Sequence, residues 1–257
     1  MSQPGLQYAI YASRVYVGKR DANGNPTNLQ WLGDSDVAKV SLTAKRADRK
    51  EGFTGKNLTT ASVIVEESAT FEFDTKNFSA ANLALALNSP VTTATSGSVV
   101  HEICGGTNVA VGDLVTLANA NVSAVSVTDS SVSPVALTAG THYTVNTAAG
   151  SLNILALPNG FTGPLQVSYS YSASSTIGAF TASSPEYWVR IEGTNTYDNS
   201  SVTLDLFRVK FEPLKDFGLI VKDFASIQVT GEVLYDPTKS SASVGGNFLK
   251  LTQVAGQ

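Results

Sequence analysis

The chain has little cysteine, little histidine and little charge. Its 257 residues include one cysteine, two histidines and 15% charged side chains, against about 25% in an ordinary soluble domain. A single cysteine excludes an intrachain disulfide, so we expect folding without an oxidising compartment. No apolar run approaches the roughly 18 residues of a membrane span, so we expect no membrane segment. The N-terminal residues also lack a secretory signal pattern.

Sequence motifs of the common enzyme classes are missing as well. The chain holds no G-x-S-x-G, P-loop or G-x-G-x-x-G pattern. His101, Glu102 and Cys104 are close in sequence, but strand alternation places Glu102 and Cys104 on one face and His101 on the other. A zinc site usually needs four ligands. Adjacent Glu66 and Glu67 would point to opposite faces, which does not suit a carboxylate pair. We therefore predict no catalytic residue, cofactor or metal site.

Basic side chains are missing from the middle of the chain. No Lys or Arg lies between Lys76 and Arg190, although the chain holds 17 of them. One interpretation is a neutral, Ser/Thr-rich β region of a larger domain. The other is a separate β domain inserted into a host domain. The second interpretation predicts a discontinuous host domain and an insertion, with these bounds: 1–95 with 176–257, and 96–175.

Alternation of apolar and polar residues predicts a mainly β fold for the flanks. Phe71 and Phe73 share one face of a predicted strand, and Val40, Leu42 and Ala44 share a face of another. Gly, Ser, Thr and Asn are frequent between such runs, as is typical of strands joined by turns.

Residues 202–211 change the phase of their alternation. The apolar residues form two successive sets: Val202, Leu204 and Leu206, then Phe207, Val209 and Phe211. Because a strand repeats every two residues, one slip exchanges its two faces. We therefore predict a β-bulge or twist near Leu206–Phe207.

One segment, residues 79–88, predicts a helix. Ser79 can cap its first turn, and Ala and Leu are strong helix formers. Leu83 and Leu87 lie one turn apart, so both should be buried against a sheet.

The predicted insertion shows its own strand pattern. Leu165, Val167, Tyr169 and Tyr171 alternate with polar residues and predict a half-buried strand. Upstream of it, we predict a three-strand meander over residues 122–155. Its turns are expected at residues 129–134, 139–141 and 148–151.

The segment from Lys45 to Lys56 concentrates basic side chains. It also contains two glycines that can bend it and one aromatic residue, Phe53, that can anchor it. Three interpretations are open: a solvated loop tip, an interaction arm between two strands, and a DNA-binding arm.

Residues 201–238, SVTLDLFRVKFEPLKDFGLIVKDFASIQVTGEVLYDPT, resemble the C-terminal half of major tail tube proteins of tailed bacteriophages. The resembling pattern is an apolar-basic strand, LFRVKFEPLKDFGLI, then an acidic-aromatic step and a second strand, IQVTGEVLYDP. The helix NLALAL also matches that family. The portion THYTVNTAAGSLNIL resembles a hairpin of many phage structural proteins, with His142 at a position where Asp is usual.

The resemblance implies a tail-tube β-sandwich or barrel with one short flanking helix and an inserted outer β-rich domain. Six copies would close into a ring, and stacked rings would form a tube in the virion tail, made in the cytoplasm of the host bacterium. Genomic DNA would pass through without specific binding. Further expected partners are the tape measure, distal tail and tail terminator proteins. No membrane partner is expected.

The resemblance also implies site residues. Contacts between rings or subunits would use the basic segment, namely Lys45, Arg46, Arg49, Lys50, Phe53 and Lys56. The lumen should be acidic or neutral so that DNA slides. Its candidate acidic residues are Glu66, Glu72 and Asp74.

Two other functions remain open. A carbohydrate-binding or adhesive β module would explain the Ser/Thr-rich middle and three aromatic residues, Tyr143, Tyr169 and Tyr171. The tube of a contractile secretion system shares the implied fold, but an insertion of this size would be unusual in it.

Overall fold

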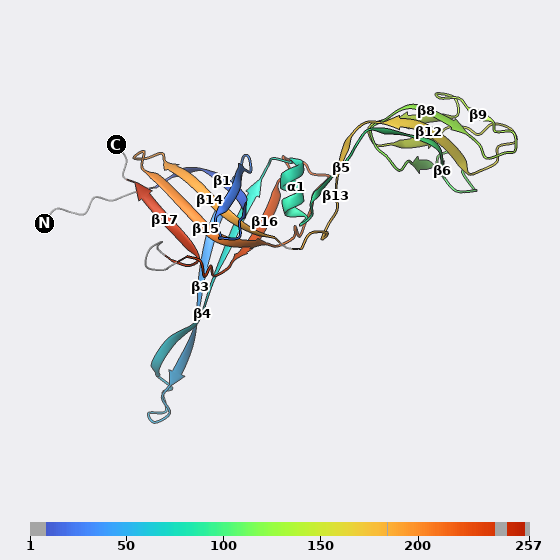
Figure 1. Ribbon diagram of the computed structural model, residues 1–257. Helices are drawn as coiled ribbons and strands as arrows, with labels where there is room; N and C mark the ends of the chain where they lie inside the picture. Colours follow the sequence, from blue (N-terminus) through green and yellow to red (C-terminus); the bar gives the residue numbers. More distant parts are fainter. Residues whose placement is uncertain (1–8, 184, 240–245, 255–257) are drawn as a thin grey trace. The chain divides into compact units, whose positions relative to one another are not determined.

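The computed structural model describes residues 9–183, 185–239 and 246–254. The fold is mainly β, as the sequence predicts, and one short helix is found in the described residues. The chain divides into two compact units (Figure 1). The first comprises Met1–Val91 and Ile177–Gln257, and the second comprises Thr92–Thr176. The predicted insertion, residues 96–175, falls inside the second unit.

The first unit is built on a sheet of eight strands within the described residues. Its main order is β2-β1-β14-β15-β16-β4-β3, and every neighbouring pair is antiparallel. Strand β15 pairs with β17 along its first half and with β16 along its last residues. The strand bounds are β1 Tyr11–Arg20, β2 Pro26–Trp31, β3 Ala38–Lys50, β4 Thr59–Thr75, β14 Glu186–Asn195, β15 Ser201–Phe211, β16 Ile227–Val233 and β17 Leu249–Val254.

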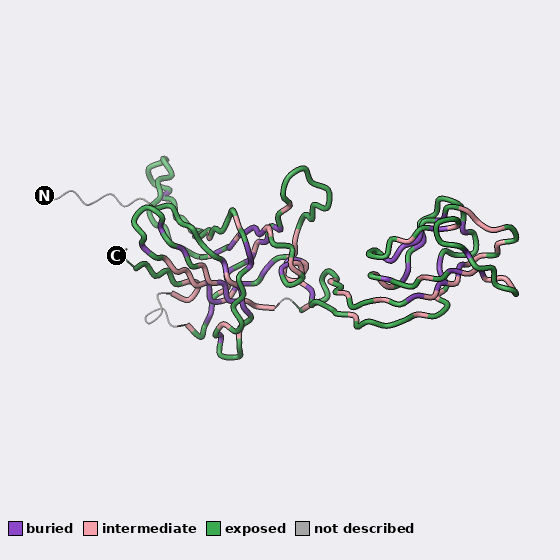
Figure 2. Tube along the Cα trace, turned by 90° about the horizontal axis from the view of Figure 1, so that it is seen from above, coloured by how far each residue is buried: buried purple, intermediate pink, exposed green. Residues whose placement is uncertain are grey.

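Apolar side chains from strands throughout this sheet share one core. Phe71 and Phe73 of β4 are fully buried in it and stack with ring centroids 5.5 Å apart. Val17 of β1 belongs to the same core as these β4 side chains, so two strands far apart in the sheet order share a common interior. Figure 2 shows the buried residues, in purple, within each unit.

The predicted bulge in β15 is confirmed. The register with β14 shifts where Val189 pairs with Leu206 and Tyr187 pairs with Val209, which leaves two residues of β15 opposite one of β14. Consecutive residues Leu206 and Phe207 are both buried as a result. Leu206 joins the core, whereas Phe207 packs on Trp188, with ring centroids 5.0 Å apart.

Charged groups lie beside this aromatic pair. Arg20 contacts Glu186 at 3.0 Å and also pairs with the buried Asp236. The hydrogen bond from Arg208 holds the pKa of Glu186 below its usual value. Lys239 lies 5.1 Å from the centre of the Trp188 ring. These ion pairs connect strands β1, β14 and β15 to the residues that follow β16.

Helix α1, Ala80–Ala86, covers part of the core. Ser79 caps it as predicted, because its side chain accepts a hydrogen bond from the Asn82 amide at 3.2 Å. Asn82 is buried and donates to the Leu32 carbonyl at 2.7 Å. Leu83 packs against the core but is half-buried. Leu87 ends the helix as its C-cap and is also half-buried, so the prediction that both leucines are buried was wrong.

We expect Leu83→Ala to lower the free energy of unfolding by about 1–2 kcal/mol, less than for a fully buried leucine. Leu87→Ala should lower it by less than about 1 kcal/mol, because Leu87 is not part of the packed core. Urea unfolding of the two variants measures both values. A larger loss for Leu87→Ala would show that the end of the helix carries more packing than its exposure indicates.

The second unit contains two sheets within the described residues, ordered β6-β12-β8-β9 and β10-β11-β7. A separate core lies between them, with Leu152, Leu165 and Val167 fully buried. At the boundary of the units, β5 and β13 pair with each other. The bounds are β5 Val91–Ala94, β6 Gly97–Cys104, β7 Leu114–Thr116, β8 Val122–Thr128, β9 Ala136–Leu137, β10 Tyr143–Asn146, β11 Ser151–Ile154, β12 Leu165–Tyr171 and β13 Ser174–Ile177.

The strand predicted at residues 165–171 is confirmed as β12, with Leu165, Val167 and Tyr169 buried. The predicted three-strand meander is wrong, although its turns fall between strands. Residues 122–154 form four strands, of which β8 and β9 pair in one sheet and β10 and β11 pair in the other. Buried Asp129 organises the first turn by accepting hydrogen bonds from the amides of Val135 and Thr162.

Candidate functional site: an exposed two-stranded arm

Strands β3 and β4 continue as a hairpin beyond the sheet that begins them. Strand β4 pairs with β16 only from Ala69 to Thr75, whereas β3 and β4 pair with each other up to Lys50 and Thr59. Residues 43–68, here called the arm, therefore have no other strand beside them among the described residues. In Figure 1 the arm extends away from the rest of its unit.

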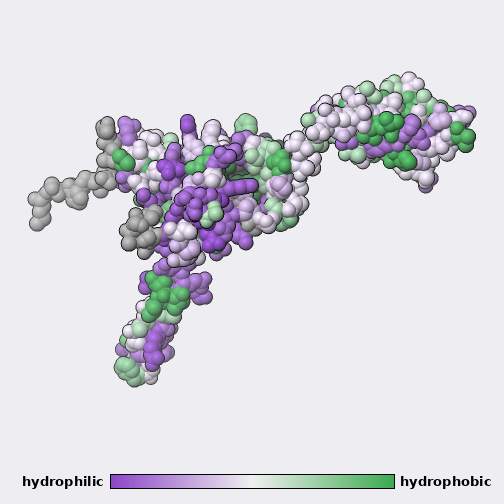
Figure 3. Space-filling view, in the orientation of Figure 1, coloured by the Kyte–Doolittle hydropathy of each residue, from purple (hydrophilic) through white to green (hydrophobic). Residues whose placement is uncertain are grey.

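Apolar side chains of the arm and its turn are open to solvent. Leu42 at its root is 70% exposed, and Phe53 in its turn is 85% exposed. Three consecutive residues of β4, Val63, Ile64 and Val65, are exposed as well, and Figure 3 shows a green apolar patch along the arm. A lone two-stranded hairpin is only marginally stable in water, and clustered exposed apolar groups mark interaction sites.

The predicted basic loop is mostly strand, which corrects the sequence interpretation. Lys45, Arg46, Arg49 and Lys50 lie on β3, and only residues 51–58 form the turn. The strand was missed because its residues are polar on both faces, which hides the alternation expected of a half-buried strand.

Glu51 shapes the turn from inside. It is buried, and its carboxylate accepts hydrogen bonds from the amides of Phe53 and Thr54 at 2.9 Å each and from the Thr54 hydroxyl. These bonds, led by the Thr54 hydroxyl, hold the pKa of Glu51 below its usual value. These bonds fix the backbone of the turn, at which Phe53 is exposed.

A shift in register between β3 and β4 lies near the base of the arm. Lys45 pairs with Glu66 and Arg46 pairs with Ile64, so Val65 is an extra residue in β4. The next pair, Ala47 with Val63, lies on the opposite face to Arg46 and Ile64. Both faces of the arm therefore carry an apolar group, Ile64 on one and Val63 on the other.

Most cations of the arm are free to meet a partner. Lys45 reaches Glu66 at 3.5 Å, an exposed pair that contributes little to stability. Among the described residues, no ion pair is formed by the other basic side chains of this segment: Arg46, Arg49, Lys50 and Lys56.

The three acidic residues predicted for a lumen differ in their surroundings. Glu66 and Glu72 lie at or near the surface and pair with Lys45 and Lys39. Asp74 is buried, and its carboxylate accepts hydrogen bonds from the amides of Asp36 and Val37 at 2.9 and 2.7 Å. The prediction of Asp74 as a lumen residue is therefore corrected: Asp74 fixes the turn before β3 and does not line an open surface.

A second exposed apolar segment, which the sequence pattern does not predict, follows β15. The sequence pattern predicts one strand over residues 206–220, but β15 ends at Phe211 and residues 212–226 form a loop before β16. Within this loop Leu219, Ile220 and Phe224 are 80%, 99% and 88% exposed. The sequence feature that marks this exposed segment is the apolar run FGLIV, but an apolar composition usually indicates burial.

Glu102 and Cys104, which lie close to His101 in sequence, make structural contacts in the second unit. The Glu102 carboxylate accepts hydrogen bonds from the Ala118 amide at 2.8 Å and from the Tyr169 hydroxyl. Cys104 faces the core of the second unit, and His101 is exposed. The described residues contain no cluster of three potential metal-ligating side chains of His, Cys, Asp or Glu.

The aromatic residues that suggested a carbohydrate site are poorly placed for it. Tyr143 and Tyr169 are buried in the core of the second unit, and Tyr171 is half-buried against it. Sugar stacking requires an accessible ring face, so these three residues do not support that function.

Cys104 should react slowly with iodoacetamide in the native protein. Burial, and to a lesser extent the nearby Glu102 carboxylate, raises the pKa of its thiol to about 11. In the unfolded chain the thiol ionises near pH 8.5, so its contribution to stability is complete below that pH and is lost as the pH rises towards about 11. Mass spectrometry after labelling at pH 8, with and without denaturant, tests this; equal labelling rates would contradict it.

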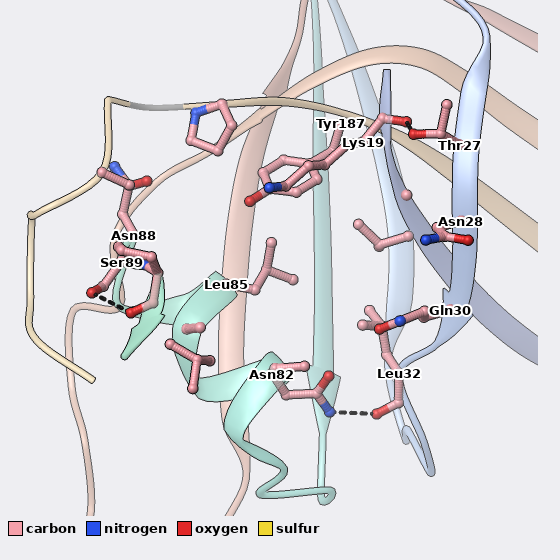
Figure 4. Close-up of a pocket in the computed structure, with 18 residues that line it drawn as sticks. Lys19, Thr27, Asn28, Gln30, Leu32, Asn82, Leu85, Asn88, Ser89 and Tyr187 are labelled. Carbon is pink, nitrogen blue, oxygen red and sulfur yellow. Dashed lines mark hydrogen bonds between the residues drawn. The ribbon is translucent and has the colours of Figure 1, made fainter. Parts of the chain in front are cut away.

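A pocket lies between α1 and strands β1 and β2. It encloses about 490 Å³ and is lined by small polar and apolar side chains. Figure 4 shows Asn82 bonded to the Leu32 carbonyl at one end, with Lys19 and Tyr187 at the other. Among the described residues that line it, Lys19 is the one charged side chain, and Tyr187 is the other titratable one.

No helix in the described parts of the chain is long and apolar enough to cross a membrane.

Comparison with known proteins places the chain in a family. No curated protein matches the sequence. A family profile described as "Protein of unknown function UCP028589" matches residues 8–252, which is nearly the whole chain. The matched region covers the second unit, the arm and all but the two ends of the first unit. The chain therefore belongs to the family "Protein of unknown function UCP028589".

Proposed function

We propose that this protein is a structural subunit that assembles with copies of itself, as a tail tube subunit of a tailed bacteriophage. The observation that carries the proposal is the arm, which exposes apolar groups and unpaired cations on a hairpin without other strand neighbours. Such a hairpin adds little stability to a monomer, because nothing covers the apolar groups on either of its faces. A partner that covers the arm would remove that apolar surface from water.

Open edges of the main sheet support self-assembly. Strands β2 and β3 end the sheet order, and β3 alone is 13 residues long. Long exposed edges are templates for pairing with another chain, and a closed ring of identical subunits removes them. In the proposed assembly, six subunits form each ring and the rings stack into a tube.

The chemistry of the chain fits a passive channel for DNA. The formal net charge is −4, and the surface acidic residues Glu66 and Glu72 are partly neutralised by lysines. A wall without a strong positive field lets a polyanion slide, whereas a cationic wall would hold it. Genomic DNA would pass through such a tube without specific binding. The tape measure, distal tail and tail terminator proteins would be its other partners in the virion.

Electron microscopy of the purified protein, combined with sedimentation velocity, tests the proposal. Hollow rings or tubes with sixfold symmetry are the expected result. A monodisperse monomer at high concentration would contradict self-assembly. Binding of that monomer to a glycan array would support an adhesive module instead.

A further inference from the structure

The exposed segment between β15 and β16, residues 217–224, forms a protrusion that we call the apolar loop. Phe217 contacts Phe78, with ring centroids 6.3 Å apart, and Phe78 precedes the helix cap Ser79. The loop is thus attached to the unit at its start. Beyond that contact, Leu219 and Ile220 extend into solvent almost completely. Adjacent aliphatic residues held in this way are typical of a protein-binding protrusion.

A recess of matching character lies at the root of the arm. This groove encloses about 370 Å³. Leu42, Ala44 and Ala69 line one side of it, and Phe248 and Leu249 line the other. No residue of the apolar loop lines the groove of its own chain. One unit therefore carries an apolar protrusion and an apolar recess that do not fill each other.

Charges beside the two surfaces are complementary. Glu67 lines the groove and pairs across the hairpin with Ala44, and Arg46 follows on the same face, about 7 Å further along β3. The apolar loop carries Lys222 and Asp223. Within the described residues, none of these four charged side chains forms an ion pair. Each surface thus offers one charge of each sign beside its apolar centre.

We propose that the apolar loop of one copy docks into the groove at the arm root of a second copy. Leu219 and Ile220 enter the groove, while Lys222 meets Glu67 and Asp223 meets Arg46. The inference rests on the proposed self-assembly and specifies which surfaces make one of its contacts. Because the loop and the groove are different surfaces, the contact is head-to-tail. Repetition of such a contact builds rings or open stacks rather than isolated dimers.

Disulfide trapping between two different variants tests this contact. Ala44→Cys in one preparation and Ile220→Cys in another are mixed before assembly and then oxidised. We expect a disulfide-linked dimer in the mixture, because only the proposed contact brings the two positions together. Val63→Cys with Ile220→Cys is the matched control, since Val63 lies on the opposite face of the arm. Buried Cys104 should stay outside the reaction.

Charge reversal gives a second readout that does not depend on oxidation. Glu67→Lys should weaken assembly, and Lys222→Glu in the same chain should restore it. A general folding defect would not be rescued in this way.

Failure of the inference can be told from failure of the proposed function. Rings or tubes that form normally without the Ala44–Ile220 crosslink, or with equal crosslinking of Val63→Cys, would overturn the docking contact alone. An unsubstituted chain that stays monomeric would overturn both. Crosslinking confined to the Ala44→Cys mixture, with rescue by the charge exchange, would support the contact.

Discussion

Shortening the arm should abolish assembly and leave a folded subunit. Lys45 and Glu66 are a pair in the hairpin, so a two-residue Asn-Gly turn can join them in place of residues 46–65. None of the removed residues belongs to the hydrophobic core of the first unit. We therefore expect the free energy of unfolding to change by less than about 1 kcal/mol.

The loss of assembly follows from what the shortened chain lacks. It has neither the exposed Val63–Val65 patch nor the Phe53 ring, and four unpaired cations are removed with them. Electron microscopy and sedimentation velocity measure assembly, and urea unfolding measures stability. Tubes of normal length from the shortened chain would show that the arm is not required. Unfolding of the shortened subunit would show instead that the arm stabilises the monomer.

Removing the second unit should have the opposite outcome, with assembly retained. Strands β5 and β13 pair with each other, so the ends left at Ala94 and Ser174 lie close enough for a short Gly/Ser linker to replace residues 95–173. The hydrophobic cores of the two units share no residue. Loop-closure entropy also changes slowly with length, so exchanging a long insert for a short linker costs little.

The experiment has two parts, the excised chain and the second unit expressed alone, and each is a control for the other. The excised chain should give a cooperative unfolding transition and rings by electron microscopy. Residues 92–176 expressed alone should fold, because their own core includes the fully buried Leu152 and Leu165. The excised chain also serves as the control for arm shortening, since it loses far more residues without touching the arm. Aggregation of both pieces would mean that the units fold only together.

The sequence by itself determined the local features of this fold. Alternation placed Phe71 and Phe73 on a buried face, and the phase slip located the bulge at Leu206–Phe207. Ser79 marked the start of the one helix found in the described residues. These features depend on neighbours within a few residues, where side-chain period and capping chemistry act directly.

Only the tertiary structure decided which faces are covered. Alternation groups Val40, Leu42 and Ala44 on one face, but Leu42 is 70% exposed although its cross-strand partner Ala69 is buried. Pairing between strands distant in sequence is not encoded in the local period. For the same reason the meander divided between two sheets, and Asp74 was buried by the turn at residues 35–37. The arm and the apolar loop are candidate interfaces because the tertiary structure leaves their apolar side chains uncovered.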